Sequence, residues 1–368
     1  MHIVHVVENA RGGISTYVDT LVRQQLQHGH TVTLISNPAR STPELRALAV
    51  NHLHYDCERT IFKLVKSVST INRHIDQIAP DIVHLHSTFP GLFGRLYTGK
   101  RHKVVYCAHG WAFCQDIPWI MKLAYAVVER VLALRTDAII NISQSERVAA
   151  EQWNVAGRHY VVRNAVEPAS PTGQSVIQHH PTKINLGFIG RHDRQKGLDF
   201  ILDILDRNPS LPVHLWVAGE HDREGKRRGR DGENYSFVGW VDKTRTDDFI
   251  CDMDAIIIPS RWEGFGLVAL EAMRNGKPVL VSDRGGLGEF IINDYNGYIF
   301  TLDSDRDLTR LLQGLKRETL AQLGANGRHV FDASSTFAKN FLNVEAIYAD
   351  ISRPVVSLSP SSTANNAT

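Results

Sequence analysis

The fold of this 368-residue chain is decided by the stretch PSRWEGFGLVALEAM, residues 259–273. The apolar run Ala255–Ile258 before it is typical of a strand that is buried on both faces. Two glycines then allow a tight turn, and a run of strong helix formers follows, ending at an Asn-Gly stop signal. The stretch therefore predicts a strand, a glycine turn and a helix, and the free N–H groups at the start of that helix favour an anion.

Two carboxylates flank this turn. Glu271 is the only charged residue between Gly266 and Met273, and a carboxylate in so apolar a helix needs a partner because burying it alone is costly. Glu263 lies eight residues earlier, on the other side of the turn. We expect the two acids to border a phosphate-sized hole, with sugar hydroxyls as their natural partners.

The length predicts two domains, because a single core stops growing at about 250–300 residues. The hydrophobic content of 43% and charged content of 22% are those of a soluble globular protein. The net charge of +2 does not indicate a nucleic-acid-binding protein. Residues 1–167 hold 18 Lys and Arg against 13 Asp and Glu, a surplus of +5 that is compatible with docking on anionic lipid.

The four cysteines, at positions 57, 107, 114 and 251, have no metal-ligand spacing and predict free thiols in a reducing cytosol. The start of the chain has neither a basic flank nor a cleavage site, so no signal peptide is expected. No apolar run reaches the ~18 residues of a membrane-spanning helix. We therefore expect a cytoplasmic protein, with the inner face of the membrane as an alternative location.

Strands alternate with helices along both halves, which predicts two parallel, doubly wound α/β sheets. The expected domains are residues 1–167 and 168–333, followed by a last helix at 334–351 and a disordered tail at 352–368. The junction after residue 168 has no periodicity up to Lys183 and is typical of a linker.

A second loop with candidate site residues follows the predicted strand Lys183–Ile189. Its sequence is Gly-Arg-His-Asp-Arg-Gln-Lys-Gly, and it places Arg191 and Lys196 where ligands bind in open α/β folds. Two such cations can neutralise a diphosphate, since arginine offers a rigid fork and lysine a mobile point charge. Either cation alone would be interpreted as part of a solvated turn.

The first half contributes two weaker signals. Gly12 and Gly13 follow the first strand and precede a helix, but they lack the three spaced glycines of a dinucleotide fingerprint, so alone they indicate a tight turn. His109 closes the strand Val104–Cys107 and so lies at the mouth of the expected crevice, although a lone histidine is usually structural.

The segment Ile117–Arg135 predicts a long helix with few charges. We favour a core helix that packs against the sheet. The alternative is an acceptor-binding or membrane-facing element, with Trp119, Met121 and Lys122 exposed near the cleft.

Glu263-x7-Glu271, with Phe265-Gly266 between, resembles the signature of the GT-B retaining glycosyltransferases of family 4, the glycogen synthase-like and phosphatidylinositol mannosyltransferase-like group. Gly-Arg191-x4-Lys196-Gly resembles the diphosphate clamp of that family, and His109-Gly110 resembles its His-Gly pair. The resemblance covers most of the chain.

The resemblance implies two Rossmann-like domains that face a cleft, with the last helix crossing back to the first domain. It implies retaining transfer of a sugar from a nucleotide-diphosphate sugar, with a UDP-sugar favoured over GDP-mannose. The acceptor would be a glycan or a lipid-linked molecule of bacterial cell-surface polysaccharide synthesis, with possible peripheral membrane contact and no nucleic acid. No cofactor and no metal are expected, since no Asp-x-Asp cluster stands at a strand end.

The resemblance also implies a role for each candidate site residue. Arg191, Lys196 and the amides around Phe265, Gly266 and Leu267 would hold the diphosphate. Glu271 would accept the ribose hydroxyls, and Glu263 would accept the sugar hydroxyls. His109 and Gly13 would close the site from the first domain.

Three alternatives stay open on the sequence. A nucleotide-sugar epimerase of the GT-B fold would release an epimerised sugar rather than join it to an acceptor. A nicotinamide dehydrogenase is disfavoured by the missing Gly-x-Gly-x-x-Gly. A non-catalytic nucleotide-sugar-binding protein is disfavoured by the intact pair of cations and the two glutamates.

Overall fold

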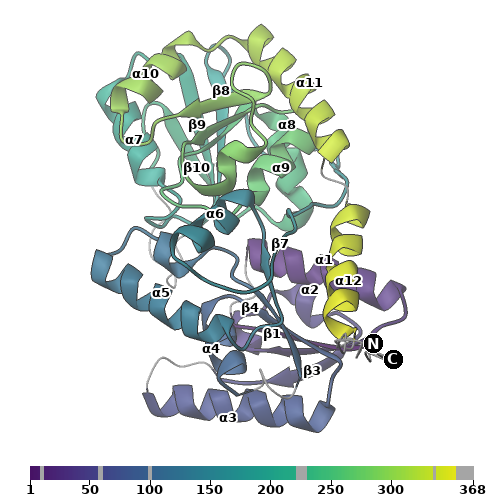
Figure 1. Cartoon of the computed structure of the whole chain (residues 1–368). Helices are drawn as coiled ribbons and strands as arrows, with labels where there is room; N and C mark the ends of the chain where they lie inside the picture. Colours follow the sequence, from purple (N-terminus) through teal and green to yellow (C-terminus); the bar gives the residue numbers. More distant parts are fainter. Residues whose placement is uncertain (9–11, 57–60, 98–101, 221–229, 335–336, 354–368) are drawn as a thin grey trace, which may run out of the picture.

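The computed structural model describes residues 1–8, 12–56, 61–97, 102–220, 230–334 and 337–353 (Figure 1). Part of the first glycine loop, most of the charged loop at 223–233 and nearly all of the predicted disordered tail lie outside these ranges. The described cysteines, Cys107, Cys114 and Cys251, are free, as predicted.

The first sheet has seven parallel strands in the order β3-β2-β1-β4-β5-β6-β7. Its strands are β1 His2–Val7, β2 Thr31–Ser36, β3 Asn51–His54, β4 Ile82–His86, β5 Lys103–Cys107, β6 Ala138–Asn141 and β7 His159–Val161. Its helices are α1 Gly13–Gln27, α2 Pro43–Arg46, α3 Ile61–Ile78, α4 Thr88–Tyr97, α5 Trp119–Ala133 and α6 Gln144–Gln152. The edge strand β3 was not predicted, because its polar sequence Asn-His-Leu-His lacks a buried apolar run.

The second sheet has six strands, again all parallel, in the order β10-β9-β8-β11-β12-β13. Its strands are β8 Ile184–Ile189, β9 Val213–Ala218, β10 Tyr235–Gly239, β11 Ala255–Ile258, β12 Val279–Ser282 and β13 Gly297–Phe300. Its helices are α7 Leu198–Arg207, α8 Thr246–Asp252, α9 Leu267–Arg274, α10 Asp305–Gly314 and α11 Arg317–Ser334. The two predicted doubly wound parallel sheets are thus confirmed.

Each sheet reverses its strand order at one point, between β1 and β4 in the first and between β8 and β11 in the second. Connections leave such neighbouring strands toward opposite faces, which opens a crevice at their carboxyl ends. The two loops with candidate site residues, after β8 and after β11, therefore start side by side.

The last helix, α12 Phe337–Ser352, returns to the first domain, as Figure 1 shows in yellow beside α1. The hydroxyl of Tyr348 lies 2.7 Å from Nδ1 of His84 in β4. The carboxylate of Glu345 lies 2.8 Å from Nε2 of His30. Both contacts hold α12 on the first domain.

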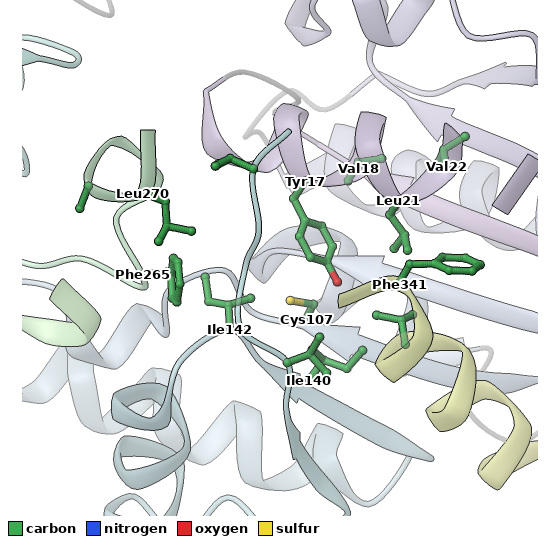
Figure 2. Close-up of a cluster of buried hydrophobic side chains, with 14 of the residues drawn as sticks. Tyr17, Val18, Leu21, Val22, Cys107, Ile140, Ile142, Phe265, Leu270 and Phe341 are labelled. Carbon is green, nitrogen blue, oxygen red and sulfur yellow. The ribbon is translucent and has the colours of Figure 1, made fainter. Parts of the chain in front are cut away.

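One buried hydrophobic cluster continues from the first sheet into the second half. Figure 2 shows Tyr17 of α1, Ile142 after β6, Phe265 and Leu270 of the α9 region and Phe341 of α12 within it. These side chains are between 1 and 5% exposed. The removal of so much apolar surface from water holds the two sheets and α12 together.

The linker is irregular, as predicted, but three aspartates of α8 hold it in place. The carboxylate of Asp247 accepts the N–H of Ser170 at 2.9 Å. Asp248 accepts the N–H of Thr172 at 2.7 Å, and Asp252 accepts that of Val176 at 2.6 Å. Charge-assisted bonds of this kind replace the backbone pairing that a helix or strand would give.

Among the helices described here, none combines the length and apolar character that crossing a bilayer requires.

Candidate functional site

The loops after β8 and β11 meet through a lysine and a glutamate. Nζ of Lys196 lies 2.6 Å from Oε2 of Glu263, and both side chains are more than three-quarters buried. The hydroxyl of Ser260 donates to the same carboxylate oxygen at 3.4 Å. Two of the predicted site residues are thus in direct contact, although 67 positions separate them in the sequence.

Glycine makes this contact possible. Gly197, at φ +68°, lies so close to the loop after β11 that an added Cβ would stand 1.9 Å from the carbonyl oxygen of Pro259. Gly266, at φ +90°, turns the chain into α9. A residue with a side chain at either position would be strained, by the positive φ at both and by the close approach of Pro259 at Gly197.

Arg191 lies on the same loop as Lys196 and is held by its neighbours. Its Nη2 lies 3.1 Å from the carboxylate of Asp193 and donates to Oε1 of Gln195 at 3.1 Å. Gln195 in turn donates to the carbonyl oxygen of Trp262 at 3.2 Å. The guanidinium is therefore oriented by a chain of contacts that leads to the loop of Glu263.

The first domain reaches the start of α9 through Gly13. A Cβ added at Gly13 would lie 3.3 Å from Cδ1 of Leu267, the first residue of α9. Phe265 is only 2% exposed, and its ring packs 5.1 Å from that of Phe290. A ligand at this helix start would thus contact the backbone of Phe265, and of the three predicted residues of this turn Leu267 adjoins Gly13.

Glu271 lies one turn into α9 and is half-buried. Burial raises the pKa of its carboxyl above the usual value, and nearby Arg274 opposes that shift. Within the part of the chain that the structure describes, no donor bonds its carboxylate. A half-buried acid with free acceptor oxygens suits ligand hydroxyls.

His109 stands at the end of β5 with a left-handed backbone at φ +53°. Its Nε2 lies 3.0 Å from Nδ1 of His86, whose Nε2 lies 2.9 Å from Nδ1 of His5. The row ends at Gln25, whose Oε1 lies 2.8 Å from His5. Burial lowers the pKa of His109 to about 3, so its imidazole is neutral at pH 7.

Three buried histidines, His5 and His86 of this row and His84 of β4, have ligand-capable atoms within 4.8 Å of one another. This is the one such group in the described ranges. All four ring nitrogens of His5 and His86 already take part in hydrogen bonds, to each other, to Gln25 and to His109. We interpret it as a hydrogen-bonded network that holds His109.

A cavity of about 960 Å³ opens between the two sheets. His109 and Glu263 line it, whereas Arg191, Lys196, Glu271 and Gly13 do not. Other lining residues are Trp119, Lys122, Ser145, Glu146, Arg194, Gln195, Arg261, Gly264 and Arg284. Glu263 lines the cavity and also contacts Lys196, so it connects the cavity with the loop after β8.

Sequence reasoning missed Glu146, a buried acid in the wall of this cavity. Its Oε2 accepts the N–H of Ile142 at 2.8 Å, and its own N–H donates to Ser143 at 3.0 Å. Burial raises the pKa of its carboxyl to about 8, so it is protonated at pH 7. The signal was the Ser-x-x-Glu capping pattern after β6.

The contact of Glu289 with the first domain was also missed. Its carboxylate accepts the N–H of Gln144 at 2.9 Å and that of Ser145 at 2.5 Å. These are free N–H groups at the start of α6, which favour an anion. An acid of the second domain thus caps a helix of the first.

Comparison with known proteins identifies the family of each half of the chain. The family described as "Glycosyltransferase Family 4" matches residues 11–170, and the family described as "Glycosyl transferases group 1" matches residues 173–330. A protein of the Klebsiella pneumoniae cps region, itself uncharacterized, is 29% identical over 330 residues, covering 85% of this chain and 89% of the relative. An Escherichia coli UDP-Gal:alpha-D-GlcNAc-diphosphoundecaprenol alpha-1,3-galactosyltransferase is 23% identical, covering 79% and 81%.

Solved structures share the fold at low sequence identity. Sucrose-phosphate synthase from Thermosynechococcus elongatus superposes with a TM-score of 0.78 at 18% identity, covering 95% of this chain and 98% of that one. HepE of Anabaena, solved in complex with UDP and glucose, gives 0.76 at 18% identity, covering 95% and 100%. The two family matches together span nearly the whole described chain, one for each sheet, and the protein belongs to the GT-B glycosyltransferases of family 4.

Proposed function

We propose that this protein transfers a sugar from a UDP-sugar to a glycan or lipid-linked acceptor with retention of the anomeric configuration, in cell-surface polysaccharide synthesis. The observation that carries the proposal is the contact of Lys196 with Glu263 between the start of α9 and the cavity. A cation there meets a leaving phosphate, and an acid there meets sugar hydroxyls.

The donor occupies the crevice at the carboxyl ends of β8 and β11. Arg191 and Lys196 bind the diphosphate and offset the charge that grows on the leaving phosphate, and such electrostatic stabilisation usually contributes more to catalysis than any other effect. The N–H groups of Gly266 and Leu267 add to this at the helix start. Glu271 accepts the ribose hydroxyls.

The sugar lies against Glu263, with His109 and Gly13 closing the site from the first domain. A neutral His109 can share a proton with a sugar hydroxyl without placing a charge beside the anomeric carbon. The bond from that carbon to the phosphate oxygen breaks, and the bond to the acceptor oxygen forms on the same face. The acceptor proton passes to the leaving diphosphate, so that no separate base is needed.

The acceptor enters through the cavity on the other side of Glu263. Its volume and mixed polar and aromatic lining suit a sugar group. The relative whose name specifies UDP-Gal and a diphosphoundecaprenol-linked acceptor supports this choice of donor base and acceptor. Closure of the two domains would exclude water and so limit hydrolysis of the donor.

The donor is tested by a thermal-shift series with UDP, GDP and ADP and their sugars. A ligand that binds the native state raises the melting temperature, and we expect UDP and its sugars to give the largest shift. A shift with NAD instead of any nucleotide sugar would contradict the proposal.

The reaction is tested by NMR of the product, which we expect to keep the anomeric configuration of the donor. Release of an epimerised free sugar would identify an epimerase instead. Catalysis is proposed to be metal-independent, so activity should persist after treatment with a chelator. Activity that a chelator abolishes and that Mg²⁺ or Mn²⁺ restores would contradict that part of the proposal.

A further inference from the structure

Three histidines lie on one face of the first sheet. His84 and His86 are two residues apart in β4, so their side chains share a face, and His5 of β1 pairs with His84 in the parallel register. All three imidazoles are 0% exposed. Strand β5 lies on the other side of β4 and pairs Cys107 with His86, which brings His109, just beyond that strand, into the same row.

The imidazoles of His5, His86 and His109 each carry one ring proton at pH 7. Burial lowers the pKa of His5 to about 4 and the pKa of His109 to about 3, and it lowers the pKa of His86 as well. A neutral imidazole has one N–H, which donates, and one unprotonated nitrogen, which accepts. A row of such rings therefore has a direction, and the group at its end decides which way it runs.

Gln25 stands at the inner end of the row and fixes this direction. Its carbonyl oxygen Oε1, which only accepts, lies 2.8 Å from Nε2 of His5, so that nitrogen carries the proton. Nδ1 of His5 is then an acceptor and takes the Nε2–H of His86 at 2.9 Å. Nδ1 of His86 in turn takes the Nε2–H of His109 at 3.0 Å. Nδ1 of His109 is left with a lone pair and no proton.

The amide of Gln25 also contacts the last helix. Its Nε2 donates to the hydroxyl of Tyr348 in α12 at 3.5 Å. The same hydroxyl lies 2.7 Å from Nδ1 of His84, and Gln25 and Tyr348 are both 0% exposed. With its nitrogen directed at α12, the amide keeps its oxygen on His5, and α12 is connected to the site through hydrogen bonds.

We propose that Gln25, acting through His5 and His86, holds His109 in the Nε2–H tautomer and so makes its Nδ1 a hydrogen-bond acceptor for a hydroxyl of the bound sugar. His109 lines the cavity between the two sheets, and no residue in the described ranges donates to its Nδ1. Tyr17 packs edge-on against the imidazole, with the ring centres 4.9 Å apart, and limits its rotation. Gln25, His5 and His86 are positioning residues, because they act through His109.

The direction of the row matters for catalysis, and this step alone rests on the proposed function. The anomeric carbon gains positive charge as its bond to the phosphate oxygen breaks. A sugar hydroxyl that donates to Nδ1 gains electron density on its oxygen, which favours a positive charge on the same sugar ring, whereas an Nδ1–H would withdraw that density. The Nε2–H tautomer therefore stabilises the transition state more than the bound donor.

The tautomer is measured by two-bond ¹⁵N–¹H correlation NMR of the full chain with ¹⁵N-labelled imidazoles, in which protonated and unprotonated ring nitrogens resonate far apart. The signals of His109 are those that His109→Asn lacks. We expect His109 in wild type to have a protonated Nε2 and an unprotonated Nδ1. An Nδ1–H tautomer in wild type, or an equal mixture of the two, would overturn the proposal.

Variants of Gln25 test its control of the row. Gln25→Met keeps the length of the side chain but offers no acceptor, and because a buried N–H left unpaired is costly, the row should reverse and His109 should become mainly the Nδ1–H tautomer. Gln25→Glu keeps an acceptor oxygen and should retain the wild-type tautomer. The matched control Gln27→Met, at an exposed glutamine of the same helix, should leave the signals of His109 unchanged. A less stable Gln25→Met protein that keeps the Nε2–H tautomer would make Gln25 merely structural.

The catalytic step is tested by the release of UDP from UDP-galactose without acceptor. In Gln25→Met, we expect kcat for this release to fall in proportion to the fraction of His109 that keeps the Nε2–H tautomer, with KM unchanged. Gln25→Glu and Gln27→Met should both retain the wild-type kcat. A reversed tautomer with an unchanged kcat would overturn the catalytic step.

The failure of the proposed function would look different from the failure of this inference. UDP binding, measured by thermal shift, should be the same in Gln25→Met and wild type, because the row does not touch the diphosphate site. A wild type with the Nε2–H tautomer of His109 that neither binds nor cleaves UDP-galactose would support the positioning by Gln25 and count against the proposed donor alone.

Discussion

Nζ of Lys196 lies 2.6 Å from Oε2 of Glu263, so a cation and an acid with separate proposed tasks form an ion pair. Lys196→Met and Glu263→Gln should each lower turnover on the order of 10²-fold, because each removes a group that acts on the transition state. Since each also frees the other from its partner, the double variant should lose less than the product of the two single effects. Steady-state kinetics of the three variants measures this.

Arg207→Ala is the control for that series, since Arg207 is an exposed cation of the same domain that pairs with Asp203 and Asp305. It should leave turnover unchanged. Fully multiplicative losses in Lys196→Met/Glu263→Gln would show that the contact has no bearing on the reaction.

Gly13 has no side chain where one would meet Leu267 at the start of α9. Gly13→Val should therefore fill the space above the proposed diphosphate site and raise the donor KM by roughly tenfold or more, equivalent to about 1.4 kcal/mol of lost binding. Gly314→Val, at a glycine with open space around its Cα, should leave the donor KM unchanged. An unaltered KM in Gly13→Val would remove Gly13 from the donor site.

The local elements of this site could be predicted from the sequence, because the strand, the glycine turn and the helix are each formed by consecutive residues. Glu263 and Lys196 could be singled out for the same reason, since each follows an apolar strand. Their contact could not be derived from local pattern, because it depends on β8 and β11 being neighbours in the sheet and on Gly197 packing against Pro259.

Residues that act across the two domains were harder to find. Glu289 and Glu146 each belong to a local pattern with an ordinary structural explanation, a glycine-rich loop and a helix cap. Only the docking of one domain on the other places Glu289 at the start of α6 and buries Glu146 beside Gly264. The outward face of α5 was likewise hidden, because few charges predict burial equally well. Its seven exposed residues are all apolar, Trp119 and Met121 among them, so the preference for a core helix was wrong for this face.

Glu146 should make stability depend on pH. Its pKa is about 8 in the folded protein against an ordinary value of 4.5, so the native state keeps a proton that the unfolded chain releases between these values. The stabilisation is complete below pH 4.5 and is lost as pH rises toward 8, at no more than about 1.4 kcal/mol per pH unit. Urea midpoints of wild type and Glu146→Gln at several pH values should converge at low pH and diverge above it.

Glu151→Gln changes an exposed acid on the same helix and serves as its control. That variant should follow wild type at every pH. If the difference in urea midpoint between Glu146→Gln and wild type does not vary with pH, the carboxyl of Glu146 is not protonated in the native state.

His109 should produce the opposite dependence at acid pH. Burial lowers the pKa of His109 to about 3 in the native state. Below about pH 6.5 the imidazole is therefore protonated in the unfolded chain but still neutral in the native state. Stability is therefore lost as pH falls from 6.5, and His109→Asn should lessen that loss. Urea unfolding between pH 7 and pH 5 tests this, with His54→Asn, at an exposed histidine of β3, as the control. If His109→Asn and wild type lose the same stability between pH 7 and pH 5, His109 is not neutral in the native state.

Glu289 should favour the closed arrangement of the two domains. Glu289→Ala removes the two bonds to the N–H groups of Gln144 and Ser145, and loss of such a helix cap costs about 0.5–2 kcal/mol. Because this cap joins the domains, we expect the cost to fall on closure, giving a larger radius of gyration in small-angle scattering and a lower kcat. Glu318→Ala, in the first turn of α11, removes an acid from a helix start within one domain and should change neither. A Glu289→Ala protein with wild-type dimensions and kcat would mean that Glu289 has no part in closure.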